Sequence, residues 1–445
     1  MLRGLVLRLP CPLSCLKGLC LPDTGHRTES HLPRKKGIYH GWTVAAVSFL
    51  ATAGAVGFAH YGFGLFIVPL EEEFGWSRTQ INLALVLGVM MQVVSPFVGR
   101  VLDLFGSRYV MTVSLAAVAA GFILRSVMVD LWQFYLFSIL VFAGGPGAAM
   151  LPAGRLVTLW FPATRGRMMG LVTAGNNFGG LLSVPILTYI IVFQGWRAAF
   201  LFTGIFLAVT AVLALLFVRD RPEDIESESG KRWAPAAAAT DAARKLVGGL
   251  AIREALSTRA FWFLAAGMTL QQFVRTTMVT QLAAHLEDSD FSATQVGAAL
   301  SVLAFFGITS KVVFGGLSEA ITARWSYALV VAIQVVGVAG FLFVAGGNFM
   351  LVFVSLSVFG LGMGGIGTLG PLAVTEMFGL RNYGAISGLI RQGVAIPGIV
   401  GPLLAGGVFD ATGSYDLAFR IILGFLALSC LCFVLARPPK WREQP

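Results

Sequence analysis

The chain has 445 residues, of which 56% are hydrophobic and only 12% are charged, and its formal net charge is +10. A soluble globular domain carries about 25% charged residues, so this composition excludes a water-soluble core of this length. The Lys and Arg residues are scattered through short gaps between apolar runs and form no basic stripe. That distribution argues against a nucleic-acid-binding protein.

Apolar stretches of about 20 residues follow one another along the chain, and each is long enough to cross the hydrocarbon core of a bilayer as an α-helix. A helix in lipid satisfies its own backbone hydrogen bonds. We therefore predict an all-α membrane protein with twelve transmembrane helices. The predicted spans are 42–69, 79–98, 109–128, 131–159, 167–192, 198–217, 260–285, 294–317, 326–345, 348–375, 383–407 and 417–436.

The predicted helices form two groups of six, and a polar segment that contains RDRPEDIESESGKR separates the groups. The expected organisation is a flexible tail (1–37), a first six-helix half (38–218), a linker (219–259), a second six-helix half (260–436) and a short tail (437–445).

Basic residues lie mainly on one side of the predicted membrane. The loops on the opposite side hold only Arg78 and Arg197, together with most of the acidic loop residues. This bias is the positive-inside signal. We expect a multi-pass protein of the cell membrane with both termini and the linker in the cytoplasm.

One pattern of Gly, acid and Arg occurs twice. In the loop after the second predicted helix stand Gly99, Asp103 and Arg108. The same spacing recurs after the eighth predicted helix, at Gly315, Glu319 and Arg324, so that all three residues are displaced by one constant offset. Glycines of the fourth and fifth predicted helices recur in the tenth and eleventh at almost the same offset. Parallel halves of this kind are typical of carriers that rock two helix bundles around a central site.

The segment GRVLDLFGSRYVM (99–111) resembles the loop 2–3 signature of the major facilitator superfamily, and the resemblance covers residues 38–436. Four further segments resemble the branch of monocarboxylate porters and oxalate/formate antiporters: YHGW, WFPATRGRMMGLVTAGNNFGG, RDRPED and GPLLAGGVFDATGSYDLAF. The resemblance implies the major facilitator fold and transport by alternating access. The chain departs from the family pattern at Ser107 and Tyr109, which replace more basic residues. The eighth predicted helix also lacks the acid expected of proton-coupled members.

Two arginines lie well inside predicted spans: Arg275 in the seventh and Arg391 in the eleventh. A cation at the bilayer centre costs at least ~2.5 kcal/mol, and the middle thirds of the predicted helices contain no Asp or Glu. Unpaired buried cations favour an anionic ligand, and the planar guanidinium suits a carboxylate. The sequence therefore predicts a substrate site for a small mono- or dicarboxylate. The alternative is that both arginines snorkel or bind backbone carbonyls.

The repeat offsets and helical spacing suggest further members of this site. The expected substrate-binding residues are Arg275, Arg391, His60, Asn176, Asn177 and Gln271. Each has an alternative structural role, because a histidine can donate to a helix carbonyl and asparagines can join helices. Lys311, near the cytoplasmic end of the eighth span, is expected to snorkel rather than to bind substrate.

Charged residues at the cytoplasmic ends of the helices are expected to form a gate. They are Asp103, Arg108, Glu319, Arg324, Arg155 and Glu376. Asp103 is expected to pair with basic or helix-end groups when the carrier faces outward. Arg155 and Glu376 end the fourth and tenth spans, where we expect a gating ion pair.

These observations predict a secondary transporter of small organic anions, working as an antiporter or a proton-linked symporter. An antiporter is favoured because an empty carrier would reorient with two uncompensated arginines. The alternatives are a multidrug or lipid exporter of the same fold and a metabolite sensor that moves nothing. The chain shows no phosphate-binding loop, metal-ligand cluster or nucleophile elbow, so we predict neither an enzyme nor a cofactor. The expected partners are the carboxylate, the bilayer and either protons or a counter-anion, with no nucleic acid and a monomeric carrier.

Overall fold

The computed structural model describes residues 40–220, 248–288, 291–342, 349–412 and 416–439. The described residues are almost wholly helical, and their one β-bridge joins Gly249 to Gly379. The predicted N-terminal tail, most of the predicted linker and residues 440–445 of the predicted C-terminal tail lie outside these residues. We call the helices before residue 221 the first half and those after residue 247 the second half.

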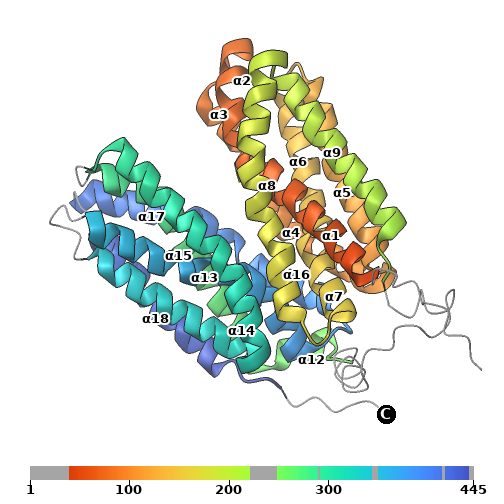
Figure 1. Ribbon diagram of the computed structural model, residues 1–445, viewed down its shortest axis with the longest axis vertical. Coiled ribbons are helices and arrows are strands. Elements are labelled where there is room, and N and C mark those ends of the chain that lie inside the picture. The colour runs from red at the N-terminus through yellow and green to blue at the C-terminus, as the bar shows by residue number, and fades with distance from the viewer. Residues whose placement is uncertain (1–39, 221–247, 289–290, 343–348, 413–415, 440–445) are drawn as a thin grey trace, which may run out of the picture. The chain divides into compact units, whose positions relative to one another are not determined.

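The first half runs from α1 to α9 (Figure 1). Its elements are α1 (His40–Thr52), η1 (Ala53–Tyr61), η2 (Phe63–Phe66), α2 (Ile67–Phe74), α3 (Arg78–Val86), α4 (Val89–Phe105), α5 (Ser107–Ser126), α6 (Leu131–Ala148), α7 (Met150–Trp160), α8 (Arg165–Gln194) and α9 (Trp196–Phe217). The first predicted span is therefore interrupted by a π-helix, η1, and a 3₁₀ turn, η2.

The second half runs from α12 to α18. Its elements are α12 (Ile252–Ser257), α13 (Arg259–Asp288), α14 (Ala293–Phe341), α15 (Phe349–Phe378), α16 (Tyr383–Gln392), α17 (Ala395–Thr412) and α18 (Asp416–Leu435). The short helix α12 lies within the predicted polar linker and was not expected from the sequence.

Nine helical stretches among the described residues are long and apolar enough to cross a membrane. One of them, α14, contains two of the predicted spans. The two spans are separated by a kink at Thr322, where φ is 71°. The eleventh predicted span is divided into α16 and α17. In the described part of the chain, each predicted span thus coincides with one or more helices, and the count of twelve crossings stays a prediction.

The duplicated pattern is visible in the backbone. Gly106 begins α5 with φ 85° and ψ 170°. Thr322, which stands at the equivalent position of the repeat, has φ 71° and ψ 152°. Such values are nearly confined to glycine. Two positions related by the sequence repeat therefore make the same turn.

The two halves meet through glycines at the end of the bundle from which the linker leaves, which we call the linker end. A Cβ added to Gly99 of α4 would lie 2.0 Å from the carbonyl oxygen of Gly384 in α16. A Cβ added to Gly166 of α8 would lie 1.9 Å from the carbonyl oxygen of Gly315 in α14. The repeat relates these two contacts, since Gly315 is the counterpart of Gly99 and Gly384 is the counterpart of Gly166. No larger side chain fits at either crossing.

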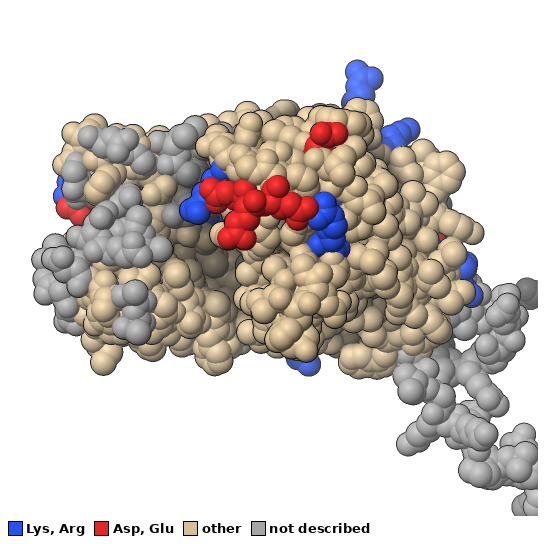
Figure 2. All heavy atoms as spheres, turned by 90° about the horizontal axis from the view of Figure 1, so that it is seen from above, with Lys and Arg blue, Asp and Glu red and all other residues tan. Residues whose placement is uncertain are grey.

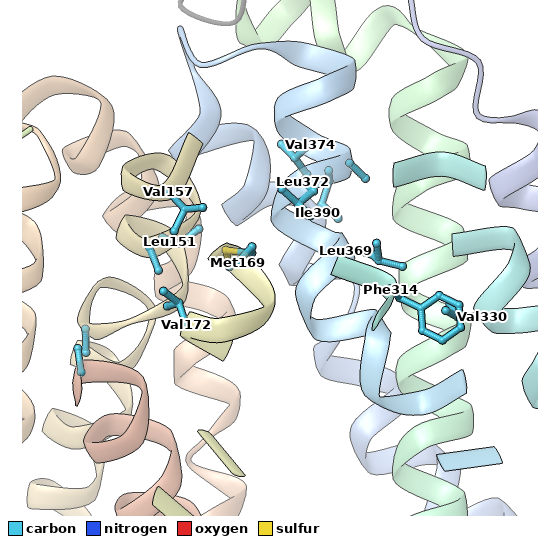
Figure 3. Close-up of a cluster of buried hydrophobic side chains, with 14 of the residues drawn as sticks. Leu151, Val157, Met169, Val172, Phe314, Val330, Leu369, Leu372, Val374 and Ile390 are labelled. Carbon is cyan, nitrogen blue, oxygen red and sulfur yellow. The ribbon is translucent and has the colours of Figure 1, made fainter. Parts of the chain in front are cut away.

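Apolar side chains from both halves pack beside these crossings (Figure 3). The ten labelled residues are at most 5% exposed. They are Leu151 and Val157 on α7, Met169 and Val172 on α8, Phe314 and Val330 on α14, Leu369, Leu372 and Val374 on α15, and Ile390 on α16. Burial of this surface holds the linker ends of the two halves together.

At the end of the first half opposite the linker end, acidic and basic side chains lie close together on the surface (Figure 2). Glu73 accepts hydrogen bonds from Nε1 of Trp196 at 2.6 Å and from Nη1 of Arg197 at 2.5 Å. Glu71 pairs with Arg78 at 2.9 Å. These contacts fasten the end of α2 to the starts of α3 and α9.

Candidate functional site

Lys311 is the buried cation at the contact between the halves. It is 7% exposed, and its Nζ donates a hydrogen bond to the carbonyl oxygen of Thr173 at 3.0 Å and another to Oδ1 of Asn177. Both acceptors belong to α8, on the other half. The expectation that Lys311 snorkels is wrong. Gly170 explains the difference, because its missing side chain lets α8 approach the α14 backbone at Lys311.

Arg391 ends α16, just before the break that leads into α17. Its side chain is partly buried and lies near the buried phenols of Tyr327 and Tyr383. Among the described residues the guanidinium has no hydrogen-bond or ion-pair partner. Among the described residues, this arginine thus carries a charge without a counter-charge.

Arg275 lies on α13, and its side chain is exposed. Its Nε and Nη2 donate to Oε1 of Gln272 at 3.2 and 3.0 Å. The predicted neighbour, Gln271, points elsewhere: it is 1% exposed, and both of its amide atoms are buried with no hydrogen-bond partner among the described residues. The charge of Arg275 also interacts with that of Lys311, so these two cations lie near one another.

Of the remaining predicted binding residues, only some contact another member of the predicted site among the described residues. Asn177 binds Lys311, whereas Oδ1 of Asn176 is buried without a hydrogen-bond partner in the described part of the chain. His60 lies in the π-helix η1, and its side chain lies outside the described ones. The structure therefore joins Lys311 to Asn177 and places Arg275 near Lys311, and the predicted ring of six stays a prediction.

Space lies beside these polar groups. A Cβ added to Gly307, one turn before Lys311 on α14, would meet no atom within 4 Å, although Gly307 itself is buried. A Cβ added to Gly367 on α15 would likewise meet none; its neighbour Thr368 has its hydroxyl 2.8 Å from that of Thr173. The positions that a side chain would occupy at Gly307 and at Gly367 are therefore open.

At the linker end, Asp103 binds the start of a helix in the other half. Its Oδ1 accepts from the backbone N–H of Gly384 at 2.8 Å, and its Oδ2 accepts from that of Ala385 at 2.9 Å. A carboxylate at a helix N-terminus pairs with unsatisfied N–H groups and with the helix dipole. Arg155 stands 3.8 Å from the same carboxylate and donates to the carbonyl of Leu102 at 2.8 Å.

Glu319 repeats this arrangement in the other half. It accepts from the backbone N–H of Arg167 at 2.8 Å and pairs with the Arg167 guanidinium at 3.2 Å. Glu376 accepts from the N–H of Ala323 at 2.8 Å and lies 3.8 Å from Arg165. An ion pair between Arg155 and Glu376 is therefore not formed, because each has a nearer partner.

The two loop arginines of the repeat have local partners. Nε of Arg108 donates to the carbonyl of Leu215 at 2.8 Å. The guanidinium of Arg324 lies 4.6 Å from the ring centroid of Trp325. Both arginines contact their own half, which fits a role in shaping the loops.

The sequence analysis did not identify one of the buried cations, Arg125. Arg125, at the end of α5, is 2% exposed and donates to Oγ of Ser138 at 2.6 Å. Its guanidinium lies 5.1, 5.2 and 5.8 Å from the ring centroids of Phe122, Phe134 and Phe200. Cation–π attraction stabilises a desolvated arginine in such a cage. Arg125 lies within the predicted span 109–128, but the sequence alone does not show which aromatic side chains surround it.

The fold and these contacts define a multi-pass helical membrane protein in which two repeated halves meet around buried cations. The chain belongs to the major facilitator superfamily, whose family model matches residues 49–402 and 273–445. Proteins of this family are transporters and not enzymes.

Three similar proteins illustrate the relationship. Monocarboxylate transporter 13 of Rattus norvegicus is 24% identical over 404 residues, which are 90% of this chain and 89% of the relative. The oxalate:formate antiporter of Oxalobacter formigenes is 24% identical over 387 residues, covering 85% and 87%. The crystal structure of the human organic anion transporter MFSD10 superposes with a TM-score of 0.63 at 16% identity, covering 88% of this chain and 99% of that one.

Proposed function

We propose that this protein is a secondary transporter that moves small carboxylates across the cell membrane by alternating access. The observation that carries the proposal is the pair Lys311 and Arg391. Both cations lie at membrane depth, and neither forms an ion pair with a carboxylate of the described residues. A buried cation without a counter-charge is unfavourable. An anion that binds here would supply the missing counter-charge, and its binding would therefore be favourable.

A carboxylate suits the donors in this region. The Lys311 ammonium and the Arg391 guanidinium supply charge-assisted hydrogen bonds, and a guanidinium donates two of them in parallel. Arg275 adds positive charge near Lys311. The relatives named for monocarboxylates and for oxalate and formate support the same class of substrate.

The contacts between the halves support a rocking mechanism. The glycine crossings and the Asp103 and Glu319 caps all lie at the linker end, and they must separate for the site to open on that side. Asp103 and Glu319 would then act as gate residues that stabilise the closed linker end. With the linker in the cytoplasm, as the loop charges favour, this conformation is the one closed to the cytoplasm.

Exchange of one anion for another fits the site better than proton symport. The position one turn before Lys311 is Gly307, so that turn of α14 offers no carboxyl to carry a proton beside the ammonium. An empty carrier would have to reorient with Lys311 and Arg391 uncompensated, whereas a loaded carrier is partly neutralised.

Counterflow in proteoliposomes tests the proposal. The purified protein is reconstituted with an excess of one unlabelled acid inside, and entry of the same labelled acid is followed for lactate, pyruvate, oxalate and formate. We expect transient accumulation of at least one of them above protein-free vesicles. Accumulation of none of them, by protein shown to be folded, contradicts the proposal.

A further inference from the structure

The hydrogen bond between Lys311 and Asn177 crosses from one half of the carrier to the other. We propose that it is a latch: it holds the linker end closed while the site is empty, and the substrate carboxylate releases it by taking the ammonium from Asn177. This inference rests on the proposed function. It adds a role for Asn177 as a positioning residue: by holding the Lys311 ammonium, Asn177 slows the reorientation of the empty carrier.

The geometry places the latch where opening must occur. Lys311 lies on α14 and Asn177 on α8, the two helices whose backbones touch at Gly166 and Gly315. Any motion that opens the linker end separates α8 from α14. The ammonium then loses both of its acceptors, Oδ1 of Asn177 and the carbonyl oxygen of Thr173.

The chemistry of the acceptor decides how strong the latch is. An amide oxygen binds an ammonium without cancelling its charge, and a carboxylate binds it more strongly because its own charge adds to the hydrogen bond. A substrate carboxylate therefore competes successfully for Lys311. With asparagine at position 177, the empty carrier is held closed and the loaded carrier is free to open. An aspartate there would hold the ammonium in both cases.

The latch occurs at only one of two repeat-related crossings. Ser95 of α4 occupies the position of the first half that is equivalent to Lys311, and its carbonyl lies against Gly388 as that of Lys311 lies against Gly170. Ser95 Oγ is buried with no hydrogen-bond partner among the described residues. The α4–α16 crossing thus has the same backbone contact without a cation, which makes Ser95→Ala a matched control.

Opening without substrate is the most direct test. Ser318, 7% exposed, lies against Gly166 at the linker end, so a Ser318→Cys probe in a background without the five native cysteines reports this opening. Maleimide labelling is measured in lipid nanodiscs with no carboxylate present. Loss of a hydrogen bond to a charged group is expected to speed labelling about tenfold in Asn177→Ala. Labelling slows in Asn177→Asp, because an ion pair replaces the amide contact.

A control separates the latch from nonspecific loosening. Ser95→Ala removes a buried hydroxyl from the other crossing and is expected to leave the labelling rate within about twofold of wild type, because Ser95 Oγ has no hydrogen-bond partner among the described residues. Opposite shifts in the two Asn177 variants cannot arise from misfolding alone. Shifts in one direction, or shifts no larger than that of the control, overturn the latch.

Flux measurements then connect the latch to transport. The ratio of exchange to net efflux into substrate-free buffer reports how seldom the empty carrier returns. We expect Asn177→Ala to lower this ratio about tenfold, and Asn177→Asp to slow both fluxes and raise the KM. An unchanged ratio in Asn177→Ala, with robust wild-type exchange, overturns the latch and leaves the proposed function intact. If the wild type moves no carboxylate, the proposed function fails, and the labelling experiment still decides the latch.

Discussion

Gly106 and Thr322 occupy equivalent positions in the two halves and turn the chain with nearly the same backbone angles, φ 85° and φ 71°. Only glycine adopts this region without strain. The Asp220 carboxylate also lies 2.5 Å from where a Gly106 Cβ would be. The backbone at Gly106 is therefore unstrained, although a side chain there would clash with Asp220. The backbone at Thr322 is strained.

This asymmetry predicts that substitutions at the two turns change the melting temperature in opposite directions. Thr322→Gly relieves strain of about 1–3 kcal/mol and gives back about 0.5–1 kcal/mol through the freer unfolded chain, so we expect a melting temperature a few degrees higher. Gly106→Ala is expected to lower it. Thermal unfolding in detergent checks both, and a drop in Thr322→Gly would contradict the strain at this turn.

The three cations of the candidate site predict a loss of transport without a loss of protein. Lys311→Ala, Arg391→Ala and Arg275→Ala are each expected to reduce uptake by about 10- to 100-fold, because a charge-assisted contact with substrate is worth about 1.5–3 kcal/mol. Arg391→Lys should recover little, since the ammonium lacks the guanidinium's paired donors. Uptake and membrane abundance are measured together. Wild-type uptake kinetics in the Lys311 and Arg391 variants would exclude these residues from the site.

Arg78→Ala serves as the control for charge removal. Arg78 pairs with Glu71 at the far end of the first half, in an exposed ion pair that is worth little. Its uptake is expected to stay within about twofold of wild type, in keeping with the small effect of such pairs.

The Asp103 cap predicts a defect in turnover more than in binding. Asp103→Asn keeps one acceptor oxygen but loses the charge that faces the start of α16, so the closed linker end is destabilised by about 1–2 kcal/mol. We expect a fall in kcat with a much smaller change in the substrate Kd. Glu319→Gln, the variant at the repeated position, should act in the same direction. Equal losses in binding and turnover would assign Asp103 a structural role.

Glu73 predicts a dependence of stability on pH at the opposite end. Hydrogen bonds from Arg197 and Trp196 hold the pKa of Glu73 below its ordinary value. The folded state thus favours the carboxylate, and the stabilisation is present above the unfolded pKa and lost as pH falls through the lowered folded pKa. Glu73→Gln is expected to lower the melting temperature slightly at pH 7 and not at pH 3. A difference that grows on acidification would reverse the sign and contradict this contact.

The positions of the helices followed from the sequence because a membrane span must be apolar along its whole length. The same logic fails at fine scale. Gln272 and not Gln271 binds Arg275, since one residue turns a helix by about 100° and hydropathy does not resolve that angle. The π-helix η1 changes the register before His60, which weakens any sequence argument about the direction of that side chain.

The candidate site shows the same division. Asp103 was expected to meet helix-end groups, and its carboxylate binds the start of α16, although its gating role stays a prediction. The contact of Lys311 was missed because it depends on Gly170 of another helix, and a single sequence does not pair those helices. Arg125 was missed for a related reason: its three aromatic partners come together only in the folded bundle.

One measurement tests the central claim most directly: uptake of a labelled carboxylate into proteoliposomes that are either empty or preloaded with the unlabelled acid, with wild type, Lys311→Ala and His60→Gln compared side by side. The account predicts much faster uptake into preloaded vesicles, no protein-dependent uptake for Lys311→Ala, and unchanged exchange for His60→Gln. Accumulation in empty vesicles driven by a pH gradient alone, undiminished in Lys311→Ala and abolished in His60→Gln, would contradict anion exchange at Lys311 and favour proton symport through His60.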